Sequence, residues 1–382
     1  MRTTTRADRV LDAVEEVCAS ASTADALLEA LSAEMHRWVP HDGSLWFGMD
    51  PVTMLATAPS RVEGLEGGLC ETFWHLEFHE QDTGLLSDLA RDGGVSALRL
   101  DLDERVSRSP RYREFMKPQG YGDELRAALR TDGSPWGVVS LYREGGHRPF
   151  DRDDVAAIDS IRPVVARALR SHVRELSPWL AQPDAPGLLV LGQSNRIVSA
   201  NAEAEAWLQE ICPIPSGADG LDYFDAFAAS EGVLDVPTPI YALVARARAI
   251  ADGRERAPAR LRVRDRRGRW LVLHASALAG PGTSAPDQVA LVIEAAKSAE
   301  IAPIIIEAYS LTPRERDVVA GIARGGSTAE IAAELFVSPH TVRDHVKTLF
   351  EKVGVSSRGE LVARLFGEHY LDRFKATMVH VD

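Results

Sequence analysis

The sequence predicts a multidomain α+β protein, in which two bodies of mixed helices and strands precede an all-α body of four short helices. Its 382 residues suggest two to four domains, at roughly 100–200 residues per domain. Short strand-like runs bounded by turn residues recur up to residue 297, whereas the C-terminal segment carries four helix-start signals. We expect domains at 1–176, 187–297 and 311–374, joined by a proline-rich linker at 177–186 and a linker helix at 298–310.

The composition is that of an ordinary globular protein, with 45% hydrophobic and 26% charged residues. No apolar run approaches the roughly 20 residues that a membrane-spanning helix needs. The first ten residues hold charges and threonines without an apolar signal core, so we expect a cytoplasmic protein with no membrane association. Cys18, Cys70 and Cys212 form no CxxC pair, which indicates small buried hydrophobes, with a redox role as the alternative.

The net charge of −13 makes the chain as a whole repel nucleic acid. The distribution is uneven, because residues 309–370 hold eight Lys and Arg against eight Asp and Glu. The acidic excess therefore lies outside the C-terminal segment. A DNA-binding function would depend on locally placed cations.

The first body begins with an amphipathic helix, predicted over Ala7–Trp38, whose apolar residues recur at helical spacing. A long helix over Arg152–Leu176 ends it, and Pro163 should bend or break that helix. Between them we predict strands at Leu45–Met49 and Thr53–Ala56, a helix at Cys70–Glu80, and a hairpin of Asp123–Leu129 with Trp136–Tyr142.

The second body begins with two strands, Gly187–Leu191 and Ile197–Ala200, followed by Asn201 as the N-cap of a helix over Ala202–Ile211. It ends with three strand-like runs, at Arg260–Arg264, Arg269–Ala275 and Gln288–Ala295. The pattern therefore predicts a second α/β module.

The third body shows capping boxes at Thr312–Glu315, Ser327–Glu330 and Ser357–Glu360, and an N-cap with a following proline at Ser338-Pro339. Gly325-Gly326 and Gly354 mark helix ends. These signals predict helices at Pro313–Arg324, Ala329–Leu335, Pro339–Val353 and Arg358–Phe366. The second and third of these helices are separated by a tight turn, as in a helix-turn-helix.

The helix Pro339–Val353 has an apolar stripe for the core, so its opposite face is free for a ligand. Arg343 and Lys347 lie four residues apart beside that stripe, where a major groove could receive them. Asp344 could accept a hydrogen bond from cytosine or fix Arg343. Further candidates for contact with DNA, mostly with phosphates, are His340, Thr341, Ser338, Thr328 and Arg358. The alternative is a solvated charged face on a small bundle.

This segment resembles the LuxR-type (GerE-like) helix-turn-helix of the NarL/FixJ/LuxR regulators. The matching pieces are Leu311–Glu315, Glu330–Ala332, Leu335–Pro339, Thr341-Val342, His345-Val346 and Lys352–Val355. The resemblance implies sequence-specific binding of double-stranded DNA by the helix Pro339–Val353, usually in a homodimer. Its DNA contacts carry over to Arg343, Asp344 and Lys347, whereas packing is the alternative role for His345.

The first body resembles a GAF domain through Gly122–Arg126, Trp136–Val139, Leu141–Arg143 and Phe150–Asp154. The second resembles a PAS domain through Gly187–Val190 and Ile197–Asn201. Both resemblances imply a sensor with a pocket between a sheet and helices, suited to a small-molecule effector whose identity the sequence does not give.

Several side chains are candidates for those pockets, and each has a plainer role. Phe73, Trp74, Phe78 and Trp136 could line the first pocket, but core packing is the stronger interpretation. His75 and His79 lie one helical turn apart, as in a metal or haem pair, but without a third ligand a packed or solvated pair is favoured. In the second body Trp207, Cys212 and Tyr223 stay undecided.

The segment Arg246–Trp270 holds ten arginines against three acidic residues. It is either a solvated basic sheet edge or an electrostatic dock for the rest of the chain, a partner or DNA.

The function predicted is that of a dimeric transcription regulator with two sensors, whose long helix Arg152–Leu176, with residues 301–309, would pair across a two-fold axis. The alternative is a signalling adaptor whose helical C-terminal body docks protein. No catalytic motif supports an enzyme.

Overall fold

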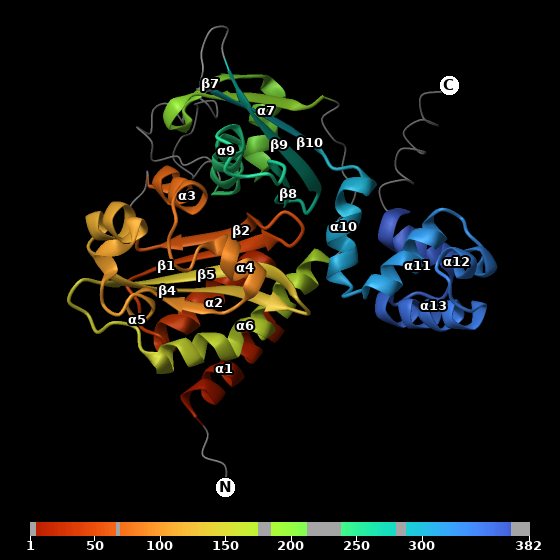
Figure 1. Ribbon diagram of the computed structural model, residues 1–382, viewed down its shortest axis with the longest axis horizontal. Coiled ribbons are helices and arrows are strands. Elements are labelled where there is room, and N and C mark those ends of the chain that lie inside the picture. The colour runs from red at the N-terminus through yellow and green to blue at the C-terminus, as the bar shows by residue number, and fades with distance from the viewer. Residues whose placement is uncertain (1–4, 66–68, 175–184, 212–237, 280–287, 368–382) are drawn as a thin grey trace. The chain divides into compact units, whose positions relative to one another are not determined.

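The computed structural model describes the chain except for residues 1–4, 66–68, 175–184, 212–237, 280–287 and 368–382 (Figure 1). Two compact units emerge. The first comprises Met1–His172 and Leu180–Ala295, and the second comprises Val173–Trp179 and Ala296–Asp382. The predicted Cys212 and Tyr223 lie outside the described residues.

The first sheet of the larger unit is antiparallel, with the strand order β2-β1-β5-β4-β3. The predicted hairpin of β4 and β5 is confirmed, and its turn holds Asp132 and Gly133 at positive φ, the geometry that matches the twist of the strands. The strands are β1 (Gly43–Asp50), β2 (Leu55–Glu63), β3 (Val95–Ala97), β4 (Tyr121–Thr131) and β5 (Ser134–Glu144).

Helices α1 (Arg6–Ser20), α2 (Ala24–Trp38) and α6 (Arg152–Val173) lie on one side of this sheet in Figure 1. The prediction of one helix over Ala7–Trp38 was wrong. The chain is extended at Ala21, and the Thr23 side chain accepts a hydrogen bond from the Ala26 amide, which starts a second helix. Helix α6 continues through Pro163 without a break.

The other face of the first sheet packs against α3 (Cys70–His79) and α4 (Leu86–Asp92). The short helix α5 (Leu98–Asp101) and single helical turns at Val106–Arg108, Tyr112–Met116 and Lys117–Gln119 follow along the chain. Ion pairs lie buried among the aromatic side chains here. Arg126 contacts Glu77 and Glu124 at 2.6 Å, and Arg111 contacts Glu124 at 2.7 Å, with all four side chains at most 3% exposed. Packed side chains therefore occupy the space between α3 and the sheet.

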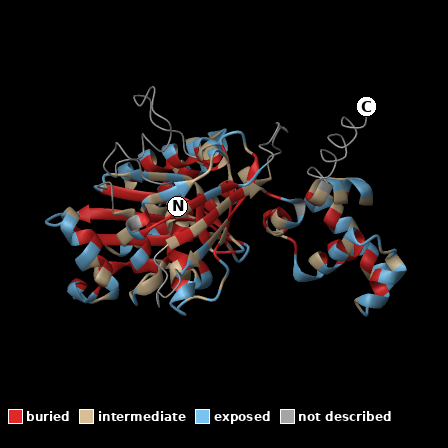
Figure 2. Ribbon diagram, turned by 90° about the horizontal axis from the view of Figure 1, so that it is seen from above, coloured by how far each residue is buried: buried red, intermediate tan, exposed pale blue. Residues whose placement is uncertain are grey.

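The second sheet has the order β7-β6-β10-β9-β8, which repeats the order of the first sheet when its strands are counted from its own first strand. Its elements are β6 (Gly187–Leu191), β7 (Ile197–Ala200), α7 (Ala202–Ile211), α9 (Thr238–Ala251), β8 (Arg260–Arg264), β9 (Trp270–Leu278) and β10 (Gln288–Ala295), with a short turn at Gln193–Asn195. The N-cap predicted at Asn201 is present, since its side chain accepts from the Ala204 amide at 3.0 Å. The first sheet buries most of its strand residues, whereas the second alternates more between buried and partly exposed positions, and its strand β7 has no buried residue (Figure 2).

The two sheets share one hydrophobic core and are joined by arginines of the second. Arg262 donates to Asp50 at 2.8 Å, with side-chain exposures of 4% and 0%. The buried Arg246 donates to the Thr53 carbonyl at 2.6 Å, and Thr57 donates to the Arg262 carbonyl at 2.7 Å. The sequence left two interpretations of the arginine-rich segment open, a solvated sheet edge or a dock for the rest of the chain. For the buried Arg246 and Arg262 the structure supports the dock.

The smaller unit is helical, with α10 (Ser298–Ala308), α11 (Pro313–Ala323), α12 (Thr328–Glu334), α13 (Pro339–Val353), α14 (Arg358–Val362) and a final turn at Ala363–Gly367. Its hydrophobic core includes nine buried aliphatic residues of these helices and the final turn: Val318, Val319, Ile322, Ile331, Val342, Leu349, Val353, Leu361 and Leu365. In the described part of the chain, no helix is long and apolar enough to cross a membrane.

Candidate nucleic-acid interface and a polar cavity

Helix α13 has the predicted bounds because both of its ends are set by local chemistry. The Ser338 hydroxyl accepts from the Thr341 amide at 3.1 Å, and Pro339 occupies the first helical position. Gly354 ends the helix in the left-handed region at φ 72°. The capping box predicted at Ser357–Glu360 is only half formed, since the Glu360 carboxylate accepts from the Ser356 amide instead.

The turn between α12 and α13 fixes how α13 is presented. Leu335 and Val337 are half-buried against the core, whereas Phe336 between them is 95% exposed at φ 55°. Val342, Leu349 and Val353 anchor one face of α13 in the bundle. The opposite face of the helix is therefore held at the surface.

Arg343 and Lys347 stand on that free face and are exposed. Within the described residues neither has a hydrogen-bond or ion-pair partner. The other cations of residues 309–366 all have one, from carboxylates, carbonyls or hydroxyls: Arg314, Arg316, Arg324, Lys352, Arg358 and Arg364. The bundle thus leaves two positive charges uncommitted, one helical turn apart.

The acidic residue beside these two cations, Asp344, pairs with a histidine and not with either of them. Asp344 accepts from His340 at 3.0 Å, with both side chains exposed. The alternative that Asp344 fixes Arg343 is therefore not what the structure shows. Arg343 keeps its full set of donors, and the Asp344 carboxylate keeps capacity for a further donor.

The predicted phosphate contacts divide into two groups. Ser338 and Thr341 share a hydroxyl contact of 2.9 Å at the exposed start of α13. Arg358 donates to the Thr328 hydroxyl at 2.7 Å and to the Gly326 carbonyl at 3.0 Å, so these two residues join α14 to the start of α12. His345 is half-buried on α13.

The sequence analysis did not predict one ion pair that positions α13, between Lys352 and Glu315. Lys352, near the end of α13, donates to the buried Glu315 carboxylate at 2.7 Å and to the Ser310 carbonyl at 3.3 Å. Burial opposes ionisation of Glu315, but hydrogen bonds from Lys352 and the Thr312 amide outweigh it and hold the pKa of Glu315 below its usual value. This pair fixes α13 against α11.

The expected sensor residues of the first body are core. Phe73, Trp74 and Trp136 are at most 3% exposed, which confirms the packing interpretation. His75 and His79 face each other with ring centroids 4.6 Å apart. In the described part of the chain, neither belongs to a group of three close metal-ligand atoms. Trp207 is buried under Arg269.

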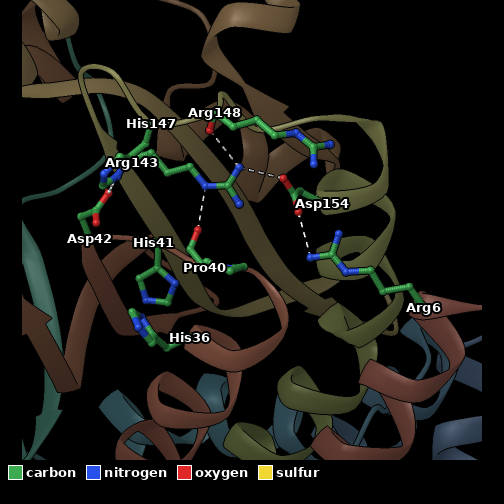
Figure 3. A pocket seen from close by; sticks show the side chains of 9 residues that line it. All are labelled: Arg6, His36, Pro40, His41, Asp42, Arg143, His147, Arg148 and Asp154. Atoms are coloured by element: carbon green, nitrogen blue, oxygen red, sulfur yellow. Dashed lines mark hydrogen bonds and ion pairs between the residues drawn. The ribbon is translucent and has the colours of Figure 1, made fainter.

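A polar cavity of about 500 Å³ opens instead where β5 leads into α6 (Figure 3). Asp42 accepts from His147 at 2.8 Å, and Asp154 accepts from Arg143 at 3.0 Å and forms an ion pair with Arg6 at 3.0 Å. The lining residues are Arg6, His36, Pro40, His41, Asp42, Arg143, His147, Arg148 and Asp154. No sequence pattern joins these positions, which come from four separate segments.

Comparison with known proteins identifies the C-terminal segment. Residues 309–365 match the GerE family, described as bacterial regulatory proteins of the luxR family. The chain is 45% identical over 76 residues to the probable transcriptional regulatory protein NarL of Mycobacterium tuberculosis, covering 20% of this chain and 32% of NarL. It is 52% identical over 56 residues to the transcriptional regulatory protein UhpA of Escherichia coli, covering 15% of this chain and 29% of UhpA.

The chain therefore spans about a third of the length of these curated relatives. Residues 309–365 form a LuxR-family helix-turn-helix domain. A solved GAF domain from a Coxiella burnetii phosphotransferase has a TM-score of 0.31 at 13% identity, covering 45% of this chain and 96% of that domain. The GAF-like and PAS-like assignments stay predictions.

Proposed function

We propose that this chain is a sequence-specific, DNA-binding transcription regulator whose recognition helix is α13. The observation that carries the proposal is the uncommitted pair Arg343 and Lys347 on the free face of a LuxR-family helix-turn-helix. A cation that is exposed and unpaired within its own domain gives up no intramolecular partner when it binds a phosphate or a base.

The N-terminal half of α13 enters the major groove in this proposal. Arg343 is suited to donate two parallel hydrogen bonds to guanine, and Lys347 to a guanine or a phosphate. Ser338, Thr341 and the amides at the start of α13 suit the phosphate backbone. Arg358 and Thr328 support this surface by holding α12 in place.

Control of DNA binding is assigned to the larger unit. We propose that it takes a small-molecule effector or a partner, and that the active form is a homodimer that reads two half-sites about one helical turn apart. An effector would act by binding one arrangement of the dimer more tightly than another.

The test begins with genome-wide mapping of bound sites, which supplies a native duplex. Fluorescence anisotropy with that duplex then compares the full chain with Arg343→Ala and Lys347→Ala. Each should lose about 1–3 kcal/mol of specific binding, and affinity should fall steeply with salt. Arg324→Ala is the matched control, because Arg324 is an exposed arginine of the same domain that is paired with Glu334 at 2.6 Å.

Wild-type affinity in both α13 variants would show that the site is wrongly assigned. A chain that binds no duplex at any salt concentration would instead support the adaptor hypothesis, in which the same bundle docks protein.

A further inference from the structure

The cavity of Figure 3 is built around a rigid guanidinium. The Arg143 side chain is 9% exposed and lies over the Phe150 ring at 4.0 Å. Its Nε donates to the Pro40 carbonyl at 2.7 Å, and its Nη1 donates to Asp154 at 3.0 Å and to the Arg148 and Pro149 carbonyls. Its Nη2 has no hydrogen-bond partner among the described residues. A fixed donor group therefore borders the hollow with one nitrogen unused (Figure 3).

A second guanidinium shares the same carboxylate. Arg6 forms an ion pair with Asp154 through Nη2 and donates from the same nitrogen to the Trp38 carbonyl, and its Nε and Nη1 have no partner among the described residues. Asp154 thus bridges two arginines and neutralises only one of them. Of the two aspartates in the lining, Asp42 is already engaged by His147 and by the Glu144 amide at 2.9 Å.

His41 completes this group from the floor of the cavity. It is 6% exposed, and its Nδ1 donates to the Val39 carbonyl at 2.8 Å. Its Nε2 has no hydrogen-bond partner among the described residues. The His36 ring lies edge-on to it with centroids 5.1 Å apart.

We propose that this cavity binds a small oxyanion, of the carboxylate or phosphate class, through Arg6, Arg143 and His41. Guanidinium groups donate in pairs to planar or tetrahedral oxyanions, and a donor held in place by packing loses little freedom on binding. Arg148 is paired with Asp151 outside the lining, whereas Arg6 and Arg143 share the single carboxylate of Asp154, so these two guanidiniums keep one positive charge beside the hollow even with every histidine neutral. A metal cation would be repelled by the same pair of guanidiniums.

Proton uptake gives the proposal a second signature. Burial lowers the pKa of His41, and the nearby His36 and Arg143 lower it further. The hydrogen bond to the Val39 carbonyl and the charge of Glu63 raise this pKa, but the net shift is downward. Asp42 is the remaining charged neighbour. A bound anion raises the pKa of His41 and favours its protonated form, in which Nε2 also donates. Affinity should therefore be highest at acidic pH and fall as the pH rises.

The experiment is isothermal titration calorimetry of the full chain with inorganic phosphate and with succinate. The pH dependence of affinity is measured separately by titrating sulfate from about pH 5.5 to 8, because the charge of sulfate is constant over this range. Arg6→Gln should weaken binding about tenfold, as expected for one charge-assisted hydrogen bond. His41→Asn retains a donor for the Val39 carbonyl but has no Nε2, so it should reduce the pH dependence.

Two matched variants control for charge and for folding. Arg37→Gln removes an arginine whose side chain is 75% exposed and outside the lining, and His75→Asn removes an exposed histidine on α3. Both should bind like the wild type.

Binding of phosphate alone or succinate alone assigns the class of ligand. The proposal is overturned if neither anion gives saturable heat, or if Arg6→Gln and His41→Asn bind as Arg37→Gln does. Because no DNA is present, this result is independent of the proposed regulatory function.

Discussion

The joint between the two sheets gives the most direct energetic test of the fold. Asp50 is fully buried and accepts from Arg262 at 2.8 Å and from the amides of Val52 and Thr53 at 2.9 and 3.3 Å. Asp50→Asn keeps an acceptor for the two amides but removes the charge opposite Arg262. A buried guanidinium without its counter-charge costs about 3–5 kcal/mol, so the variant should lose that much stability.

Urea denaturation of the full chain, followed by tryptophan fluorescence and circular dichroism, measures this loss as a lower midpoint for the larger unit. The double variant Asp50→Asn/Arg262→Met should recover much of it, because the uncompensated charge is then gone. Asp88→Asn breaks an exposed pair with Arg91 on the same unit and should cost about 0.5 kcal/mol or less. A loss below about 1 kcal/mol in Asp50→Asn would show that water reaches the joint and that the buried-pair argument is wrong.

Two further predictions concern titratable groups. Glu315 has a folded-state pKa below its usual value, so its contribution is present at neutral pH and is lost as the pH falls through that folded pKa. Glu315→Gln should therefore destabilise α11 and α13 by about 1–2 kcal/mol at neutral pH, measured by amide hydrogen exchange, and should flatten the acid dependence; an unchanged acid profile would contradict this. Burial raises the pKa of the Cys18 thiol to about 11, so peptide mass spectrometry should find it alkylated about 100-fold more slowly at pH 8 than an ordinary cysteine. Rapid labelling of Cys18 in the folded chain would exclude that environment.

The sequence predicts best those features that are determined by residues close together along the chain, such as the ends of helices. The bounds of α13 follow from Ser338, Pro339 and Gly354, which lie at the helix ends themselves. The single helix predicted over residues 7–38 failed for a local reason too. Apolar periodicity continued across Ala21, but the Thr23 hydroxyl satisfied a new helix start, and periodicity alone does not detect such a break.

What the sequence could not predict depends on partners far away along the chain. Arg262 pairs with Asp50 across 212 positions, so the arginine-rich segment could not be distinguished from a solvated edge. Lys352 and Glu315 are 37 positions apart, and the capping box already accounted for Glu315. The cavity has the same origin, because Arg6 and Asp154 meet only when α1 packs beside α6.

The distribution of charged pairs connects these findings to function. In the larger unit Arg262 is paired with Asp50 between the two sheets and Arg143 with Asp154 in the cavity wall, whereas the helix-turn-helix leaves Arg343 and Lys347 without partners among the described residues. Helix α6 supplies Asp154 to the cavity from its first turn, where that carboxylate is already shared by two arginines. The two charges on α13 have no such carboxylate in the described part of the chain, so they stay available for the phosphates and bases that the proposed function requires.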